Sequence, residues 1–261
     1  MILSYGVNET ESELDLHQEE IQRLGYTIID SGLNKQAVVN IGLEIERCKK
    51  EYIRLYGDDF LKSIGEHNGI RMPLTMSEHI FNLVFNDKLL SYIDKLMYGN
   101  FLLNQQNVVI NPAKESYNQA LWHRDLPYQH FVSSRPLAIN ALFCVDDFTV
   151  ENGSSWVVPG SHKEEKFPSE DYMNKHAIQV EAKAGSFILL DCMTYHKGGF
   201  NQTNNTRRAI NHVFSTPMIS QQIKFRSSDF TQFDLTDRQK FILGLNVKDN
   251  SSVKNYLASR S

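Results

Sequence analysis

The second half of the chain consists of short β-favouring runs separated by turn residues, and this pattern constrains the fold more than any other feature. β-branched, aromatic and other apolar residues gather over a few positions at a time, and proline, glycine and asparagine stand between the runs. Many short strands joined by turns favour a sandwich or jelly roll over alternating β–α units. The runs lie at 101–103, 108–110, 137–145, 156–158, 178–180, 186–190 and 209–214.

The first hundred residues and the tail have mostly helical spacing instead. We therefore expect one domain over 1–261, with a mostly helical cover over about 1–100, a β core over 101–220 and an extension over 221–261. In chain order, the expected outer elements are a helix from Thr10 or Ser12 to Gly25, a strand at 26–30, a helix at 34–56, a helix after Ser77, a helix ending at Gly99, and one or two helices within 234–261.

The composition is that of an ordinary soluble globular protein, with 41% hydrophobic residues, 22% charged residues and a formal net charge of −4. Mild acidity gives no electrostatic reason to expect nucleic acid or an anionic membrane as a partner. The cysteines, Cys48, Cys144 and Cys192, are widely spaced and form no CxxC pattern. With no signal-like N-terminus and no apolar run long enough to span a bilayer, we expect a cytoplasmic protein.

Within the β-rich half, His123, Asp125 and His196 form a candidate metal site. Two imidazoles and one carboxylate are the ligand set of non-haem Fe(II) oxygenases. At the end of a strand, positions i and i+2 point to the same face, so His123 and Asp125 can reach one metal. Arg207 supplies a planar cation suited to a carboxylate-bearing co-substrate. An isolated HxD triplet can equally be explained as a surface histidine beside an arginine–aspartate pair. The combination with His196 and Arg207 favours a metal site.

From Asn104 to Ser215 the chain resembles the phytanoyl-CoA hydroxylase (phytanoyl-CoA dioxygenase) family of Fe(II)- and 2-oxoglutarate-dependent dioxygenases. The order and spacing of the matching residues hold over more than a hundred positions. The residues that carry the resemblance are His123-Arg124-Asp125, Glu151-Asn152-Gly153, Val158-Pro159-Gly160-Ser161-His162, Gly185, His196, Asn201 and Arg207.

The resemblance implies a double-stranded β-helix (a cupin-like jelly roll) covered by N-terminal helices. It also implies an oxidoreductase with His123, Asp125 and His196 as iron ligands and Arg207 on the distal carboxylate of 2-oxoglutarate. With O₂, such an enzyme hydroxylates or otherwise oxidises an unactivated C–H bond of a small-molecule metabolite, and 2-oxoglutarate is decarboxylated to succinate and CO₂. Related halogenases replace the carboxylate ligand with a small residue, so Asp125 favours hydroxylation over halogenation.

This chain departs from the family at two positions that touch 2-oxoglutarate. Gly198 and Leu142 stand where a serine or threonine and an aromatic residue are common. The residues proposed to take over these contacts are Asn140, Asn107 and Thr194. The residues proposed to contact the substrate, because they flank the metal motif, are Gln119, Trp122, Tyr128 and His130.

Two other histidines and two other functions need to be considered. His162 is expected to hold a turn, and His212 to face outward from a strand. The alternative functions are a catalytically silent jelly-roll binding protein and a cupin-like metalloenzyme that does not use 2-oxoglutarate. The intact triad argues against the first, and Arg207 argues against the second. The substrate and the oligomeric state are not specified by the sequence.

Overall fold

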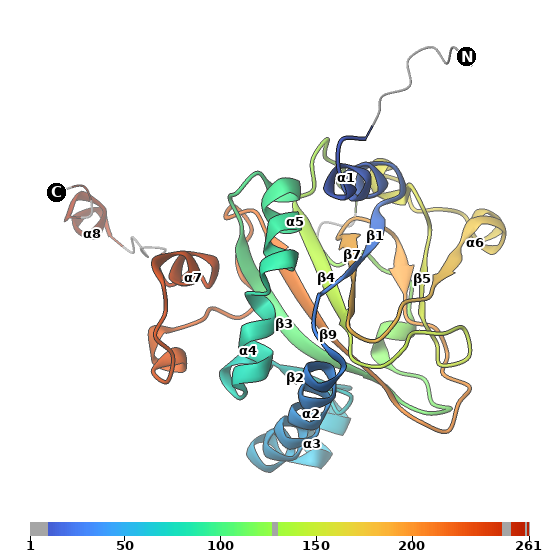
Figure 1. The fold of residues 1–261 in the computed structure, drawn as a ribbon, viewed down its shortest axis with the longest axis horizontal. Coiled ribbons are helices and arrows are strands. Elements are labelled where there is room, and N and C mark those ends of the chain that lie inside the picture. The colour runs from blue at the N-terminus through green and yellow to red at the C-terminus, as the bar shows by residue number, and fades with distance from the viewer. Residues whose placement is uncertain (1–9, 127–129, 247–251, 259, 261) are drawn as a thin grey trace.

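The computed structural model describes residues 10–126, 130–246, 252–258 and 260. Within them, the strands pair antiparallel and form two open sheets, not a closed barrel (Figure 1). The larger sheet has the order β1-β7-β4-β9-β3-β2, and the smaller has the order β6-β5-β8. The strands of the larger sheet are β1 (Tyr26–Asp30), β2 (Gly69–Arg71), β3 (Leu102–Asn111), β4 (Ala138–Cys144), β7 (Ser186–Asp191) and β9 (Arg207–Ser215). Those of the smaller sheet are β5 (Ser155–Val157), β6 (Ile178–Val180) and β8 (His196–Lys197).

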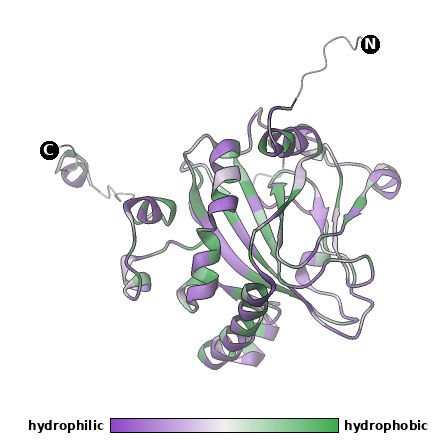
Figure 2. Ribbon diagram, viewed as in Figure 1, coloured by the Kyte–Doolittle hydropathy of each residue, from purple (hydrophilic) through white to green (hydrophobic). Residues whose placement is uncertain are grey.

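Helices pack against the outer face of the larger sheet (Figure 1). The long helix α2 carries both hydrophobic and hydrophilic residues (Figure 2), and it buries Val38, Ile41 and Ile45 at helical spacing. The fold is therefore mainly antiparallel sheet with helices, as the sequence predicts. The helices are α1 (Glu13–Leu24), α2 (Lys35–Tyr56), α3 (Asp58–Ser63), α4 (Glu78–Val84), α5 (Asp87–Met97), α6 (Glu170–His176), α7 (Asp237–Ile242) and α8 (Val253–Ala258).

The two faces of the larger sheet differ in chemistry. Alternate residues of β4, such as Ile139 and Phe143, join the main core under the helices. The intervening positions point to the inner face, where Cys144 packs in a separate apolar cluster with residues of the smaller sheet. Asn140 lies on this inner face as well, and it is buried. This alternation places polar side chains of the central strands between the two sheets.

The first hundred residues contribute both edge strands of the larger sheet. The predicted strand at 26–30 is confirmed as β1, which pairs with β7. The second edge strand, β2, pairs with β3 and was not predicted, because it is only three residues long. It matters for function, since it carries Arg71 to the inner region of the sheet.

Gly25 connects the N-terminal helix to the chain that precedes His196. It ends α1, whose N-cap is Ser12, in a left-handed conformation with φ 86°. Its carbonyl accepts hydrogen bonds from the backbone of Asp191 at 2.8 Å and from Thr194 Oγ1 at 3.0 Å. A side chain at this position would collide with Thr194 and His162, so glycine is required for contact as well as for backbone conformation.

The first part of the tail packs against the main core, whereas every described residue of α8 is exposed. The predicted helices within 234–261 are confirmed as α7 and α8 (Figure 1). Ile242 and Leu243 at the end of α7 are buried in the core that also contains Phe225 and Phe230. No helix in the described ranges is long and apolar enough to cross a membrane.

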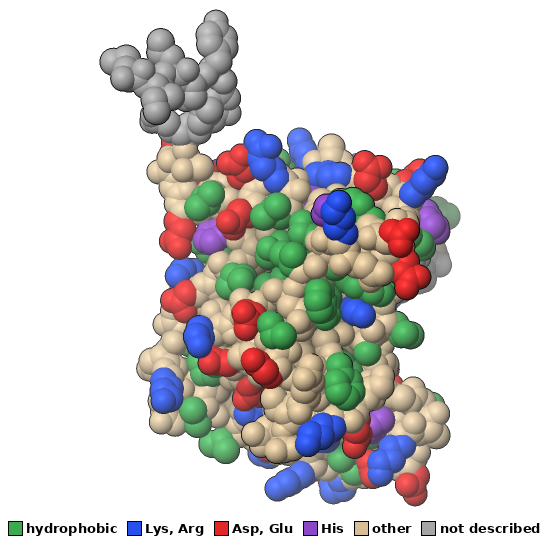
Figure 3. Space-filling view, turned by 90° about the vertical axis from the view of Figure 1, so that its right-hand side faces the viewer, with side chains coloured by type: hydrophobic (Ala, Val, Ile, Leu, Met, Phe, Trp, Pro, Cys, Tyr) green, Lys and Arg blue, Asp and Glu red, His purple; other side chains and the backbone are tan. Residues whose placement is uncertain are grey.

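One face of the molecule and the three cysteines have ordinary chemistry. On the face shown in Figure 3, acidic and basic side chains are interspersed, with hydrophobic side chains scattered among them. Cys48, Cys144 and Cys192 are all buried and free. Burial raises the pKa of the Cys48 thiol to about 11, so this residue stays a neutral core group at physiological pH.

Two buried histidines lie outside the candidate metal site. His162 occupies a buried turn and contacts the carbonyl of Gln22 at 3.2 Å, as its predicted turn role requires. His212 does not face outward, and that expectation was wrong. It is fully buried on β9, with Nδ1 3.0 Å from the carbonyl of Ala141, because β9 lies inside the sheet and both faces are covered.

These histidines make stability depend on pH. Burial lowers the pKa of each to about 4, against an ordinary value of 6.5. Between pH 6.5 and 4 these two imidazoles therefore bind more protons in the unfolded chain than in the folded chain, so their contribution to stability falls as the pH falls. From pH 7.5 to pH 5, each histidine should cost about 2 kcal/mol of unfolding free energy, measured by urea denaturation. His212→Asn keeps a donor near Ala141 and should remove about half of this pH-dependent loss; an unchanged slope would contradict the prediction.

Candidate metal centre

A pair of backbone hydrogen bonds brings two histidines that are distant in sequence side by side. His123 N donates to the carbonyl of His196 at 2.9 Å, and His196 N donates back to the carbonyl of His123 at 3.0 Å. This is an isolated β-bridge; the strand end predicted at His123 does not form. Two residues after His123, Asp125 N donates to the carbonyl of Cys192 at 2.9 Å, four residues before His196.

The bridge brings three possible metal-ligand atoms close together. One nitrogen of each histidine and one oxygen of Asp125 all lie within 4.8 Å of one another. Asp125 Oδ1 is 3.7 Å from His123 Nε2 and 3.6 Å from His196 Nε2. The three side chains are largely but not fully buried, with exposed fractions of 29% for His123, 11% for Asp125 and 12% for His196. A cation could therefore be held here and still be reached from one side.

Neighbouring groups orient each of the three side chains. His123 Nδ1 lies 2.7 Å from the carbonyl of Leu121, and His196 Nδ1 lies 2.9 Å from the carbonyl of Thr194. A carbonyl accepts only, so each Nδ1 carries the proton and each Nε2 presents its lone pair to the site. Asn140 Nδ2 donates to Asp125 Oδ2 at 3.0 Å, which leaves Oδ1 directed at the histidines. This donor set fits a divalent transition metal.

The electrostatics also favour a bound cation. Burial alone would raise the pKa of the Asp125 carboxyl, but His196, His123 and Asn140 together hold it well below its usual range. Burial lowers the pKa of His196 below its usual value, more than the Asp125 carboxylate raises it. The Asp125 carboxylate and the neutral His196 imidazole are thus in the protonation states that metal ligands need. For His123, burial lowers the pKa but the Asp125 carboxylate and the Leu121 carbonyl raise it by more, so metal binding would displace its proton.

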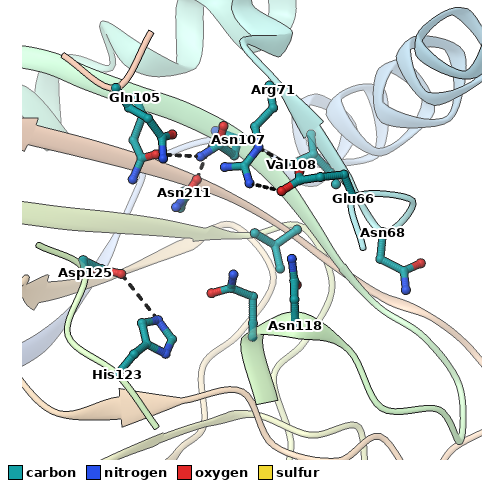
Figure 4. A pocket seen from close by; sticks show the side chains of 14 residues that line it. Glu66, Asn68, Arg71, Gln105, Asn107, Val108, Asn118, His123, Asp125 and Asn211 are labelled. Atoms are coloured by element: carbon teal, nitrogen blue, oxygen red, sulfur yellow. Dashed lines mark hydrogen bonds and ion pairs between the residues drawn. The ribbon is translucent and has the colours of Figure 1, made fainter. Parts of the chain in front are cut away.

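A polar cavity of about 200 Å³ adjoins two of the three residues, His123 and Asp125, and neither His196 nor Arg207 is in its lining. His123 and Asp125 form part of its wall, and Gln119 of the turn before them lines it too. Facing them across the cavity, Asn107 of β3 and Asn211 of β9 lie opposite each other in register (Figure 4). The metal site thus opens onto a space large enough for a small molecule.

Arg207 is a buried cation at the start of β9. It is 2% exposed; its Nη1 donates to the carbonyl of Gly153 at 2.7 Å, and its guanidinium lies 3.9 Å from the centre of the Phe148 ring. Burial lowers its pKa below the usual value, although an arginine stays protonated at neutral pH. Among the described residues no carboxylate lies within ion-pair distance, and its Nε has no hydrogen-bond partner. A bound anion would compensate this charge.

The adjacent Arg208 points to the opposite face, as strand alternation predicts. It forms a bidentate pair with Asp146, through Nε at 3.0 Å and Nη2 at 2.7 Å, and it also reaches Glu46. Its charge is therefore already compensated within the protein. Of these two neighbouring arginines, only Arg208 forms an ion pair with a carboxylate of the described residues.

Sequence reasoning missed Tyr117. Arg207 Nη2 donates to its hydroxyl at 3.4 Å, and burial raises the pKa of this phenol above its usual value. A side chain at Gly198 would collide with the Tyr117 hydroxyl, so glycine there makes room for the tyrosine. The signal that could have found it was the departure at Gly198, where the family often has a hydroxyl of its own.

The other candidate residues lie in several different surroundings. Asn107 and Gln119 line the cavity, and Asn140 contacts Asp125 instead of the cavity. The Thr194 side chain is turned away, to the carbonyl of Gly25, and only its backbone carbonyl serves the site. Trp122 and His130 are not in the cavity lining. Trp122 stacks on Tyr195, and His130 is exposed and lies beside Phe167. Tyr128 lies outside the described residues.

Residues 21–209 match the family described as phytanoyl-CoA dioxygenase. The match covers most of the chain and includes His123, Asp125, His196 and Arg207. The chain belongs to the phytanoyl-CoA dioxygenase family. The sequence-based assignment to this family of non-haem iron oxygenases is thereby confirmed.

Individual relatives agree with this membership. The chain is 27% identical over 222 residues to an uncharacterized protein of Mycobacterium tuberculosis, covering 83% of this chain and 81% of the relative. It is 31% identical over 116 residues to the iron/alpha-ketoglutarate-dependent dioxygenase ausO of Aspergillus calidoustus, covering 42% of this chain and 39% of the relative. The structure is similar to that of EctD from S. alaskensis with 2-oxoglutarate and 5-hydroxyectoine, with a TM-score of 0.67, 19% identity, and coverage of 81% and 79%. This likeness confirms the jelly-roll fold.

The contact between Asn140 and Asp125 predicts a specific loss of metal affinity. Asn140→Leu keeps the side-chain size and removes the donor that orients the carboxylate, so Mn(II) should bind about 10- to 100-fold more weakly. Electron paramagnetic resonance of free Mn(II) during a titration measures this directly.

Thr194→Val is the matched control. It removes a buried hydrogen bond to Gly25 and should lower the unfolding free energy by about 1 kcal/mol, but it keeps the carbonyl that orients His196. Mn(II) affinity should stay unchanged. Equal loss in the two variants would mean that the effect comes from packing and not from the orientation of Asp125.

Proposed function

We propose that this protein is an Fe(II)- and 2-oxoglutarate-dependent dioxygenase that hydroxylates or otherwise oxidises an unactivated C–H bond of a small-molecule metabolite. The observation that carries the proposal is the convergence of His123, Asp125 and His196 beside a polar cavity, with each side chain held by its own hydrogen bond. Family membership supports the same reaction class.

The three residues would hold the iron through His123 Nε2, His196 Nε2 and Asp125 Oδ1. Three ligands on one side of a metal leave the other positions open for co-substrates. Asp125 also supports oxidation over halogenation, because a carboxylate occupies the position that a halide would need. The bound iron and 2-oxoglutarate would supply the oxidising chemistry, with release of succinate and CO₂.

Arg207 would bind the distal carboxylate of 2-oxoglutarate. Its guanidinium is buried, charged and without a carboxylate partner in the described part of the chain. An anion that enters this site would accept charge-assisted hydrogen bonds from the guanidinium, whose Nε has no partner, and would compensate a buried charge. Tyr117 would add a hydroxyl beside the same carboxylate, since it already contacts Arg207.

The remaining residues of the site would position the substrate and exclude water. Asn107, Gln119 and Asn211 line the cavity beside the metal ligands and offer fixed hydrogen-bonding groups. We assign all of these functions to a single dioxygenase domain, because the larger sheet combines strands from the N-terminal part and from the β-rich part.

Anaerobic addition of Fe(II) and 2-oxoglutarate to the purified protein tests the proposal. We expect a visible metal-to-ligand charge-transfer band, which His123→Ala should abolish. A folded wild-type protein that gives no band would refute the proposed function. A metal-bound protein that shows no response to 2-oxoglutarate would support a cupin-like metalloenzyme instead.

Titrating the same band with 2-oxoglutarate separates the two neighbouring arginines. Arg207→Gln removes the proposed carboxylate partner and should weaken 2-oxoglutarate affinity at least about tenfold. Arg208→Gln removes an equal charge one residue away, on the opposite face, and should leave the affinity unchanged. Equal weakening in both variants would contradict the assigned role of Arg207.

A further inference from the structure

The cavity beside the metal site is lined mainly by carboxamide side chains. Half of its fourteen lining residues are asparagine or glutamine. They come from separate elements: Asn107 and Gln105 from β3, Asn211 from β9, and Asn118 from the turn that precedes His123 (Figure 4). A carboxamide presents a donor and an acceptor side by side, and a hydroxyl group can serve both at once.

The cavity has no uncompensated positive charge in its described lining apart from the metal site. Its one basic side chain, Arg71, is tied to Glu66 by two hydrogen bonds, from Nε at 2.9 Å and from Nη2 at 2.5 Å. The remaining nitrogen, Nη1, lies 3.1 Å from the Asn107 carboxamide oxygen in the amide orientation that satisfies its neighbours. Arg71 therefore fixes an amide in place and is not available as the partner of a phosphate or carboxylate.

Apolar lining is scarce. Val108 and Val109 are the only apolar side chains among the described lining residues. A fatty-acyl chain would offer no hydrogen bond to the carboxamide groups that are still free, such as Asn118 Oδ1. The volume of about 200 Å³ is also below the range of about 300–1,000 Å³ typical of pockets for drug-sized ligands.

The amides of the inner sheet face are held in fixed positions. Asn211 Oδ1 accepts a hydrogen bond from Asn107 N at 3.0 Å, which directs the Asn211 Nδ2 group away from that bond. Asn118 Nδ2 donates to the carbonyl of Gly65 at 3.3 Å, so its Oδ1 is free to accept. Fixed donors and acceptors on two sides of a small space select a ligand by the directions of its polar groups.

We propose that this cavity binds the primary substrate, and that the substrate is a compact, uncharged, polyhydroxylated ring such as a monosaccharide or cyclitol unit. The proposal rests on the proposed oxygenase function and adds the substrate class to it. Asn107 and Asn211 contact one side of the ring, Asn118 contacts the other, and the metal site lies at the edge formed by His123 and Asp125.

Binding of matched probes beside the metal tests this. The protein is loaded with Mn(II) and 2-oxoglutarate, with protein in excess, and paramagnetic relaxation of probe protons is measured by NMR. The probes are a set of neutral methyl glycosides and myo-inositol, glucose 6-phosphate as the charged counterpart, and cyclohexyl methyl ether as the ring without hydroxyls. We expect relaxation enhancement for at least one neutral polyol, several-fold above that for the phosphate or the ether.

Variants connect the binding to the carboxamides. Asn211→Leu and Asn118→Leu should each weaken binding of the polyol about tenfold, because each leaves a hydroxyl unpaired. The exposed Asn118 tests the proposal even if Asn211→Leu fails to fold. Gln36→Leu removes an exposed amide on α2, far from the cavity lining, and should have no effect.

Three results would overturn the proposal: no enhancement for any neutral polyol, equal or greater enhancement for the phosphate or the ether, or polyol binding that survives both variants. The charge-transfer band with Fe(II) and 2-oxoglutarate shows which claim has failed. If the band forms and the polyols do not bind, only the substrate class is wrong. If the band does not form, the oxygenase function fails and the substrate proposal fails with it.

Discussion

The reciprocal backbone hydrogen bonds between His123 and His196 are the contact on which the whole site depends. They join a segment that follows β3 to one that follows β7, and they place Asp125 within reach of both imidazoles. The protein fixes this contact from several directions, because the segment before His196 is bonded to Gly25 at the end of α1. Helix α1, the sheet and the segment that carries His196 are therefore joined by direct hydrogen bonds.

The second determinant is the unequal chemistry of the two faces of the larger sheet. Under the helices the strands bury aliphatic and aromatic residues and supply most of the hydrophobic stabilisation. On the inner face the same strands carry Asn107, Asn140 and Asn211, which contribute less to stability but have fixed directions because the sheet fixes their backbones. A rigid sheet is thus used on one side for packing and on the other for recognition.

Three arginines show how local pairing decides what a charge can do. Arg208 is neutralised by Asp146, and Arg71 is neutralised by Glu66, so both serve to hold structure. Arg207 is more deeply buried and has no such partner in the described residues. The energetic cost of that unpaired charge is lowered by an aromatic ring and a carbonyl, and a bound carboxylate would lower it further. The three guanidinium groups are chemically identical, and only their surroundings distinguish them.

The sequence by itself determined the strands of the β-rich half other than β8, the caps of α1 and α4, and the end of α2 before Gly57. It also determined the residue types of a His–Asp–His site with Arg207. These are set by local periodicity, turn chemistry and motif spacing, which a single chain displays directly. Tertiary structure alone decided the rest. Four features depend on segments that are distant in the sequence and adjacent in the fold. They are the edge strand β2 with Arg71, the Tyr117 hydroxyl that fits beside Gly198, the burial of His212, and the carboxamide cavity. No local pattern marks such residues, because their role lies in the neighbours that the fold gives them.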